Sequence, residues 1–325
     1  MNPYGAAAKA FAFARTGNRP MASSSDQALA PTTTAARTSL LARAGHWVLL
    51  RILVQAAALV IVVAVMSRLL GLVIPPPGAA GHAEWATVRN LVDAALLLGV
   101  YGLTIGWMEQ RTPVEIGPRA GAVQFPGGVV IGATMMAAVY AVLAGMGLAS
   151  FGPGTGLQGL GVGLASALMA GVFEELLLRA VLFRNLEQAF GTTIALVVSA
   201  AVFGLLHSFN PGATAFSDAA IALEAGLLLA LTYAVTRNLW LAIGLHAGWN
   251  FTEGNVFGAQ VSGGPAAPSL IHSTLTGPTL LTGGAFGPEA SVVAIGVCGL
   301  VAVVFAIIVI RGGGWRPLSF RLSVP

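Results

Sequence analysis

Charged residues are scarce in this sequence. Asp, Glu, Lys and Arg make up 9% of its 325 residues, whereas about 25% is typical of a soluble domain. Hydrophobic residues make up 56%, and the mean hydropathy is +0.82. This composition excludes an ordinary soluble domain and predicts an all-α, polytopic protein whose main partner is the lipid bilayer.

Cysteine and lysine are almost absent. The single cysteine, Cys298, excludes an internal disulfide and a zinc–thiolate site. Lys9 is the only lysine, and the arginines form no patch with interleaved aromatic residues, so nucleic acid is not an expected partner. Residues 1–44 contain no long apolar run, so we expect a flexible cytoplasmic tail and no cleavable signal peptide.

The apolar stretches predict about eight transmembrane helices in a membrane domain over residues 45–311. These stretches are 47–74, 88–108, 128–148, 157–183, 192–207, 219–235, 239–251 and 292–310. The fifth and the seventh are too short for a lipid-facing helix, so we expect them to be sheltered inside the bundle. A long Gly/Pro/Ser/Thr-rich outer loop, 252–288, precedes the last stretch, and a basic tail, 312–325, follows it.

The arginines predict the orientation of the chain. With eight spans, only Arg68 and Arg89 fall on one side of the membrane, and every other arginine outside the core of the spans falls on the opposite side. The positive-inside rule then places both termini in the cytoplasm. The heavy use of Ala, Gly and Arg is typical of a GC-rich bacterial genome, so we expect the bacterial cytoplasmic membrane.

Two adjacent carboxylates interrupt the fourth apolar stretch. Glu174 and Glu175 lie in the segment GVFEELLLRAVLFR, which also contains Arg179. A charge inside a membrane segment costs at least a few kcal/mol, and like charges at close range resist joint ionisation. Because Glu175 and Arg179 are four residues apart, we expect them to form a buried ion pair, which leaves Glu174 for chemistry.

Two histidines and an asparagine extend this polar set. His246 and Asn250 are one helical turn apart and share a face, where they suit a substrate carbonyl or a water. Glu174 lies 17 residues before Gly191, and His207 lies 16 residues after it. Two antiparallel helices joined at Gly191 would therefore hold Glu174 and His207 at the same depth, as a general base that activates water.

Small residues recur every four positions in the fourth stretch, at Gly159, Gly163, Ala167 and Gly171. Such a stripe allows close helix packing in a membrane, so the adjacent carboxylates should point toward neighbouring helices. In contrast, Asp218 and Glu224 lie near the start of the sixth stretch, where we expect surface positions near the membrane interface.

Three of these segments resemble motifs of a known family. EELLLR resembles the EExxxR motif of the CAAX protease and bacteriocin-processing (CPBP, or Abi) family, FGLLH resembles its FxxxH motif, and HAGWN resembles its HxxxN motif. The order and the approximate spacing also match, and the resemblance covers roughly residues 109–251.

The resemblance implies an eight-helix intramembrane endopeptidase, like the eukaryotic CAAX-prenyl endopeptidase, that acts on a peptide or protein substrate at the membrane. Glu174 would then activate water with His207, and His246 and Asn250 would stabilise the oxyanion. Glu175 and Arg179 would support these residues.

Two questions stay open at this level. The family is often labelled metalloprotease, and Glu174, His207 and His246 are residue types that bind zinc, so either no cofactor or a divalent metal is compatible with the motifs. The main alternative function is a non-catalytic immunity or peptide-binding protein of the same family. A proton-coupled transporter is a third hypothesis, but the sequence shows no inverted repeat.

Overall fold

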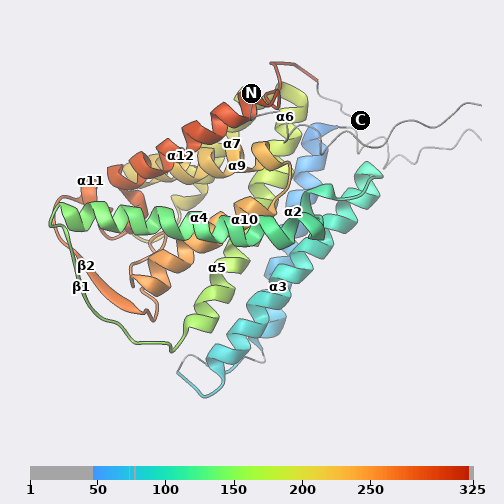
Figure 1. Cartoon of the computed structure of the whole chain (residues 1–325). Helices are drawn as coiled ribbons and strands as arrows, with labels where there is room; N and C mark the ends of the chain where they lie inside the picture. The colour runs from blue at the N-terminus through green and yellow to red at the C-terminus, as the bar shows by residue number, and fades with distance from the viewer. Residues whose placement is uncertain (1–46, 73, 77, 322–325) are drawn as a thin grey trace, which may run out of the picture. The chain divides into compact units, whose positions relative to one another are not determined.

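The computed structural model describes residues 47–72, 74–76 and 78–321, so the predicted tail over residues 1–44 lies outside the described residues. Within them the chain is almost entirely helical (Figure 1). The α-helices are α2 (Val48–Gly71), α3 (His82–Thr104), α4 (Pro118–Gly145), α5 (Leu160–Glu175), α6 (Arg184–Phe190), α7 (Thr192–His207), α8 (Ala215–Ile221), α9 (Leu227–Thr236), α10 (Trp240–Phe251), α11 (Thr279–Thr282) and α12 (Val292–Arg311).

Short π-helical segments extend or join several of these helices. They are η1 (Ile105–Glu109), η3 (Leu176–Phe183), η4 (Ala222–Gly226) and η5 (Thr252–Val256), and the turns η2 (Val114–Ile116) and η6 (Pro288–Ala290) are 3₁₀-helical. Segments of π-helix are rare and occur often at functional sites. In this chain, most of the buried carboxylates described below lie inside a π-helical segment or directly before one.

The helical membrane fold predicted from composition is confirmed. Six helices of the described part are long and apolar enough to cross a membrane. The two shorter predicted stretches correspond to α7, with 16 residues, and α10, with 12 residues. Whether these two cross the bilayer, and hence the number eight, stays a prediction.

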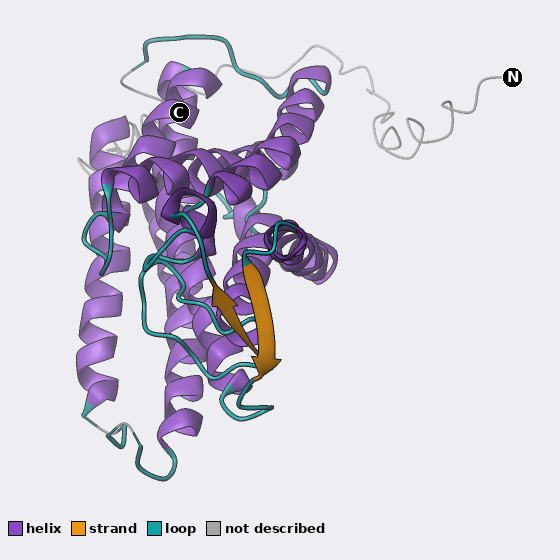
Figure 2. Cartoon of the chain, turned by 90° about the vertical axis from the view of Figure 1, so that its left-hand side faces the viewer, coloured by secondary structure: helices purple, strands orange, loops and turns teal. Residues whose placement is uncertain are grey.

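Two short strands were not expected. β1 (Ala149–Pro153) follows α4 and pairs antiparallel with β2 (Ile271–Leu275) inside the long outer loop (Figure 2). The pairing aligns Phe151 with Ser273, and the Tyr140 hydroxyl of α4 lies 3.0 Å from the Ser273 hydroxyl. The outer loop is therefore tied to the membrane helices along part of its length.

Helices α4 and α10 cross at very close range, as their ribbons in Figure 1 indicate. The contact is made by Gly128 and Gly132 of α4 and by Gly244 and Gly248 of α10. A Cβ atom on any of these glycines would lie within 3.0 Å of backbone atoms of the other helix. Small residues at such crossings let helix backbones approach in a membrane, where apolar burial gives little driving force. This crossing fixes α10, which carries His246.

We expect Gly128→Ala to lower the free energy of unfolding by about 1–3 kcal/mol, because the added methyl group must push α10 away. The matched control is Gly127→Ala, since a Cβ atom on Gly127 would meet nothing within 4 Å. Thermal unfolding in detergent micelles measures both variants. Equal midpoints for the two variants would contradict the proposed role of the crossing.

A buried ionic network joins one end of several helices. The Glu109 carboxylate accepts hydrogen bonds from Arg184 at 2.8 and 2.6 Å and from Arg111 at 2.8 Å. Arg111 also pairs with Glu115 at 2.7 Å, and the Arg51 guanidinium lies 3.7 Å from Glu109. Arg51, Arg111 and Arg184, three of the arginines that predict the orientation, therefore lie at the same end of the bundle.

The turn at Gly191 is present as predicted. Gly191 has φ +87°, and a Cβ atom there would overlap the carbonyl of Pro317. The chain after α12 passes over this turn, where the Arg316 carbonyl accepts a hydrogen bond of 3.1 Å from the Thr192 amide, and the Ala189 carbonyl accepts one of 3.0 Å from the Arg321 amide. The position of α7 relative to α6 thus depends on Gly191, because its positive φ and the nearby Pro317 carbonyl both exclude a side chain.

Candidate active site

The fold brings the predicted site residues together from three helices. Glu174 and Glu175 end α5, His207 ends α7, and His246 and Asn250 lie on α10. The small-residue stripe of α5 makes this approach possible, since a Cβ atom on Gly171 would lie 3.2 Å from the Ile243 carbonyl of α10. The charged end of α5 therefore faces α10 and not the lipid.

Glu175 is at the centre of a buried chain of charged groups. It is fully buried, and its Oε1 accepts a hydrogen bond of 3.0 Å from the Arg179 guanidinium. The same oxygen lies 3.0 Å from His246 Nδ1. A carboxylate can only accept, so His246 Nδ1 carries the hydrogen. The predicted Glu175–Arg179 ion pair is thus present, and it also orients His246.

Arg179 is held through its two terminal nitrogens, while its buried Nε has no hydrogen-bond partner within the described residues. Its guanidinium donates to the carbonyls of Ala225 at 2.8 Å and Gly226 at 3.3 Å, and it lies 4.5 Å from the centroid of the Phe203 ring. Breaking a buried ion pair by removing one partner typically costs about 3–5 kcal/mol, because the other charge is left uncompensated. Arg179 is therefore a structural anchor for Glu175.

Glu174 occupies a more open position than Glu175. Its side chain is 26% exposed, and its Oε2 has no hydrogen-bond partner within the described residues. This oxygen lies 3.9 Å from His246 Nε2, which is beyond hydrogen-bond range. The two carboxylates and the Arg179 guanidinium together carry a net charge of −1. A proton on His246 Nε2 would bring the net charge of the four groups to zero. His246 is thus placed between two carboxylates that favour its imidazolium form.

His207 has the tautomer that a general base needs. Its Nδ1 lies 2.8 Å from the Phe203 carbonyl oxygen, which can only accept, so Nδ1 carries the hydrogen. The ring also stacks on Phe203, with centroids 4.9 Å apart. Nε2 of the neutral ring is therefore free to accept a proton from a water molecule.

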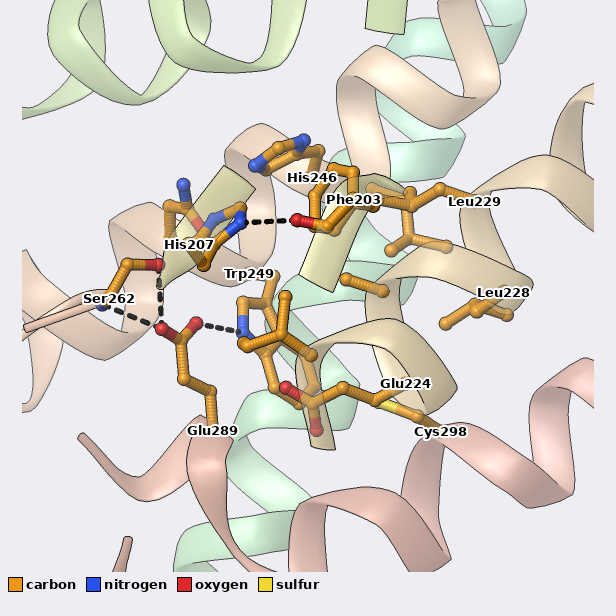
Figure 3. A pocket seen from close by; sticks show the side chains of 14 residues that line it. Phe203, His207, Glu224, Leu228, Leu229, His246, Trp249, Ser262, Glu289 and Cys298 are labelled. Carbon is orange, nitrogen blue, oxygen red and sulfur yellow. Dashed lines mark hydrogen bonds between the residues drawn. The ribbon is translucent and has the colours of Figure 1, made fainter. Parts of the chain in front are cut away.

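Three cavities meet at these residues. One of about 290 Å³ is lined by Glu174 and His207 together with apolar side chains of α2, η3 and α7. A second, also about 290 Å³, extends from Asn250 along the small-residue face of α5. The third, of about 30 Å³, lies between them and is lined by His207, His246 and Asn250 (Figure 3). A substrate could thus reach the polar residues from two sides.

The residues suggested as metal ligands do not form a ligand set in the described part of the chain. Glu174, His207 and His246 are not assembled there into a group of three that could hold a metal ion. His207 Nδ1 and His246 Nδ1 donate to the Phe203 carbonyl and to Glu175, which leaves Nε2 of each ring without a hydrogen bond to the described residues. The arrangement supports acid–base chemistry and hydrogen bonding.

Sequence reasoning missed a second set of buried carboxylates beside the site. Glu224, Glu253 and Glu289 have exposed fractions of 2%, 0% and 3%. The expected surface position of Glu224 is wrong, because Glu224 is buried in the π-helical turn η4 and lines a cavity with Glu289 of the outer segment before α12. Asp218 is half-buried and accepts a hydrogen bond of 2.7 Å from the Ser208 hydroxyl. Only the contact between segments far apart in the sequence reveals this burial.

Comparison with known proteins agrees with the motifs. Residues 156–252 match the model of a family described as type II CAAX prenyl endopeptidase Rce1-like. No curated protein and no solved structure gives a significant match to the chain. The matched range contains the EELLLR, FGLLH and HAGWN segments, and the chain is an integral membrane protein by its helices. The resemblance seen in the motifs is thus confirmed over residues 156–252, whose match to an Rce1-like model is consistent with the CAAX protease family.

Proposed function

We propose that this protein is an intramembrane endopeptidase that hydrolyses a peptide bond with a water activated by Glu174 and His207. The observation that carries the proposal is the division of labour between the two acids. Oε2 of each acid has no hydrogen-bond partner within the described residues. Glu175 is nevertheless fully buried, with its Oε1 engaged by both Arg179 and His246, whereas the Glu174 side chain is 26% exposed and its Oε2 lies 3.9 Å from His246 Nε2.

The proposed reaction begins with a water between Glu174 and His207, which line the same cavity. One of these groups takes a proton from the water as its oxygen attacks the substrate carbonyl, and general-base catalysis of this kind contributes about 10²–10⁴-fold. Both groups are fixed by elements that meet at the Gly191 turn. Holding the water in this position lowers the entropic part of the barrier.

His246 and Asn250 are proposed to stabilise the oxyanion that forms on the carbonyl. The Asn250 side chain makes no hydrogen bond with the described residues, so its amide group is available to a substrate. His246 Nε2 donates when the ring is an imidazolium, a form that Glu175 and Glu174 favour. A single donor of this type typically contributes about 10²–10³-fold to turnover.

The substrate is proposed to be a peptide or protein in the membrane. The cavity at Glu174 and His207 is also lined by Val60 and Leu206, which are 48% and 47% exposed on the apolar surface of the helices. An apolar segment of a substrate can therefore reach Glu174 from the lipid side. We further propose the bacterial cytoplasmic membrane with both termini in the cytoplasm. The arginine-rich end supports this orientation, since Arg51, Arg111 and Arg184 meet there at Glu109.

Substrate trapping tests this function. The Glu174→Ala protein, purified with bound material after cross-linking in cells, should retain peptides that mass spectrometry identifies. Purified wild-type protein should then cleave these peptides, and the Glu174→Ala protein should not. If wild-type protein cleaves none of them and Glu174→Gln preserves the cellular phenotype, the non-catalytic peptide-binding hypothesis replaces this one.

We also propose that the water is activated without a metal. In that case cleavage by wild-type protein should be unchanged by incubation with 1,10-phenanthroline, because no metal is needed to lower the pKa of the water. The control is a zinc peptidase assayed in the same detergent, which should lose its activity. Loss of cleavage that added Zn²⁺ restores would contradict the metal-free proposal and leave the peptidase assignment intact.

A further inference from the structure

Glu224 is a buried acid beside the site, and it takes no part in the reaction proposed above. It lies in η4, has an exposed fraction of 2%, and its Oε2 has no hydrogen-bond partner. No arginine, lysine or histidine of the described residues forms an ion pair with it. Its carboxyl group lines the cavity of about 30 Å³ that also contacts His207, His246 and Asn250 (Figure 3).

Both oxygens of the neighbouring acid Glu289 accept hydrogen bonds. One oxygen accepts hydrogen bonds from the Ser262 amide at 2.6 Å and the Ser262 hydroxyl at 2.7 Å. The other accepts one of 3.4 Å from the Trp249 indole. A carboxylate that receives donors on both oxygens favours ionisation. Glu289 is therefore the member of the acidic set whose two oxygens both have donors.

Glu224 has no such donors, although it lines the same cavity as Glu289. Glu253 lies beside Glu289 and accepts from its amide at 3.2 Å, and burial raises the pKa of the Glu253 carboxyl well above its usual value. The other titratable groups along the cavity are His207, His246 and the buried thiol of Cys298. A buried charge without a partner costs several kcal/mol, so Glu224 holds its proton.

The cavity is the right size for water and too small for an organic group. A water needs about 10–15 Å³ of such space, and the cavity provides about 30 Å³. One or two waters thus fit in the cavity that Glu224 and the histidines line. They would satisfy the oxygen of Glu224 that has no partner.

We propose that Glu224 is a proton-donating residue that acts through cavity water on the leaving nitrogen of the substrate. This inference rests on the proposed function. Peptide hydrolysis must protonate the leaving amine, because an amide anion is too poor a leaving group. The protonated carboxyl of Glu224 lines the cavity beside the site and can act as the proton donor. Glu174 and His207 act on the attacking water instead.

The proton balance closes over one turnover. The attacking water forms the new carbon–oxygen bond and transfers one proton to Glu174 or His207. As the carbon–nitrogen bond breaks, Glu224 gives its proton through the cavity water to the nitrogen, and the amine leaves neutral. The proton held by Glu174 or His207 then returns to Glu224 along the same water. No other reactant is required.

A comparison of amide and ester substrates tests this role. The probes are a fluorogenic peptide with a cleavage site identified by trapping, and its analogue with an ester oxygen in place of the scissile NH. An alkoxide leaves more easily than an amide anion, so the ester depends less on a proton donor. Glu224→Gln should lower kcat for the peptide by about 10²-fold and for the ester by less than about threefold.

The matched control is Cys298→Ala, which alters the lining of the same cavity and should leave the ratio of the two rates unchanged. An equal loss for both substrates in Glu224→Gln would show a purely structural role and overturn the inference, with the peptidase assignment intact. If wild-type protein cleaves neither probe, the proposed function fails first. Infrared spectroscopy then decides on the proton itself: Glu224→Gln should remove the contribution of one protonated carboxyl from the carboxylic-acid carbonyl band, to which Glu253 also contributes, and an unchanged spectrum overturns the inference.

Discussion

Glu174→Gln and His207→Ala are each expected to lower peptide cleavage by about 10³–10⁴-fold, the upper range for loss of a general base. Both groups line the cavity where the attacking water would lie, and neither change removes a partner of the buried Glu175–Arg179 pair. The double variant should lose little more than either single variant, because residues that act on one water work as a unit.

Cleavage of a trapped fluorogenic peptide by purified protein in micelles measures this effect. Glu84→Gln is the matched control, since Glu84 is exposed at the start of α3 and is another acid in the same membrane domain. All three single variants should elute as wild-type protein does in size exclusion and unfold at a similar temperature. Full activity in purified Glu174→Gln or His207→Ala would remove the central claim of the mechanism.

The main features of this site were predictable because charge is so rare in the sequence. In an apolar run, Glu174, Glu175 and Arg179 have no solvent to face, so their burial and their contact with other polar groups follow from elementary energetics. The i, i+4 spacing predicted the Glu175–Arg179 pair, which the structure contains at 3.0 Å. The turn at Gly191 likewise followed from the lengths of the stretches on either side.

The contacts of Glu175 and the position of Glu224 were not predictable in the same way. The bond from His246 to Glu175 depends on how deeply α10 is inserted, and this depth is set by the glycine crossing with α4, whose partner cannot be identified from one sequence. Glu224 lies near the start of the predicted stretch 219–235, where a carboxylate usually meets the membrane interface, but near the middle of the observed helical span Ala215–Thr236. The outer segment that carries Glu289 folds back over it, and this long-range contact has no local signal.

The three metal-binding residue types show a related limit. Glu174, His207 and His246 have the composition of a zinc site, and their order in the sequence does not distinguish a zinc site from an acid–base site. In the structure a backbone carbonyl holds His207 Nδ1 and Glu175 holds His246 Nδ1, so the direction of each Nε2 is fixed by contacts that the sequence does not show.

Arg179→Met is expected to have the largest effect on stability, a loss of about 3–5 kcal/mol in the free energy of unfolding. The change leaves the carboxylate of Glu175 fully buried with only His246 as a partner. Methionine fills much of the same volume, so the loss measures the missing charge and not a cavity. Thermal unfolding in micelles measures the effect, with Arg68→Met as the control because Arg68 is exposed at the end of α2.

The double variant Glu175→Gln/Arg179→Met separates the two roles of this pair. Removing both charges removes the uncompensated carboxylate, so much of the lost stability should return, and the coupling between the two changes should be about 0.5–3 kcal/mol. Activity should not return, because His246 then has no carboxylate on Nδ1 and is no longer favoured as an imidazolium. If the double variant regains both stability and cleavage, then Glu175 serves only to neutralise Arg179, and the orientation and charge of His246 must depend on Glu174 alone.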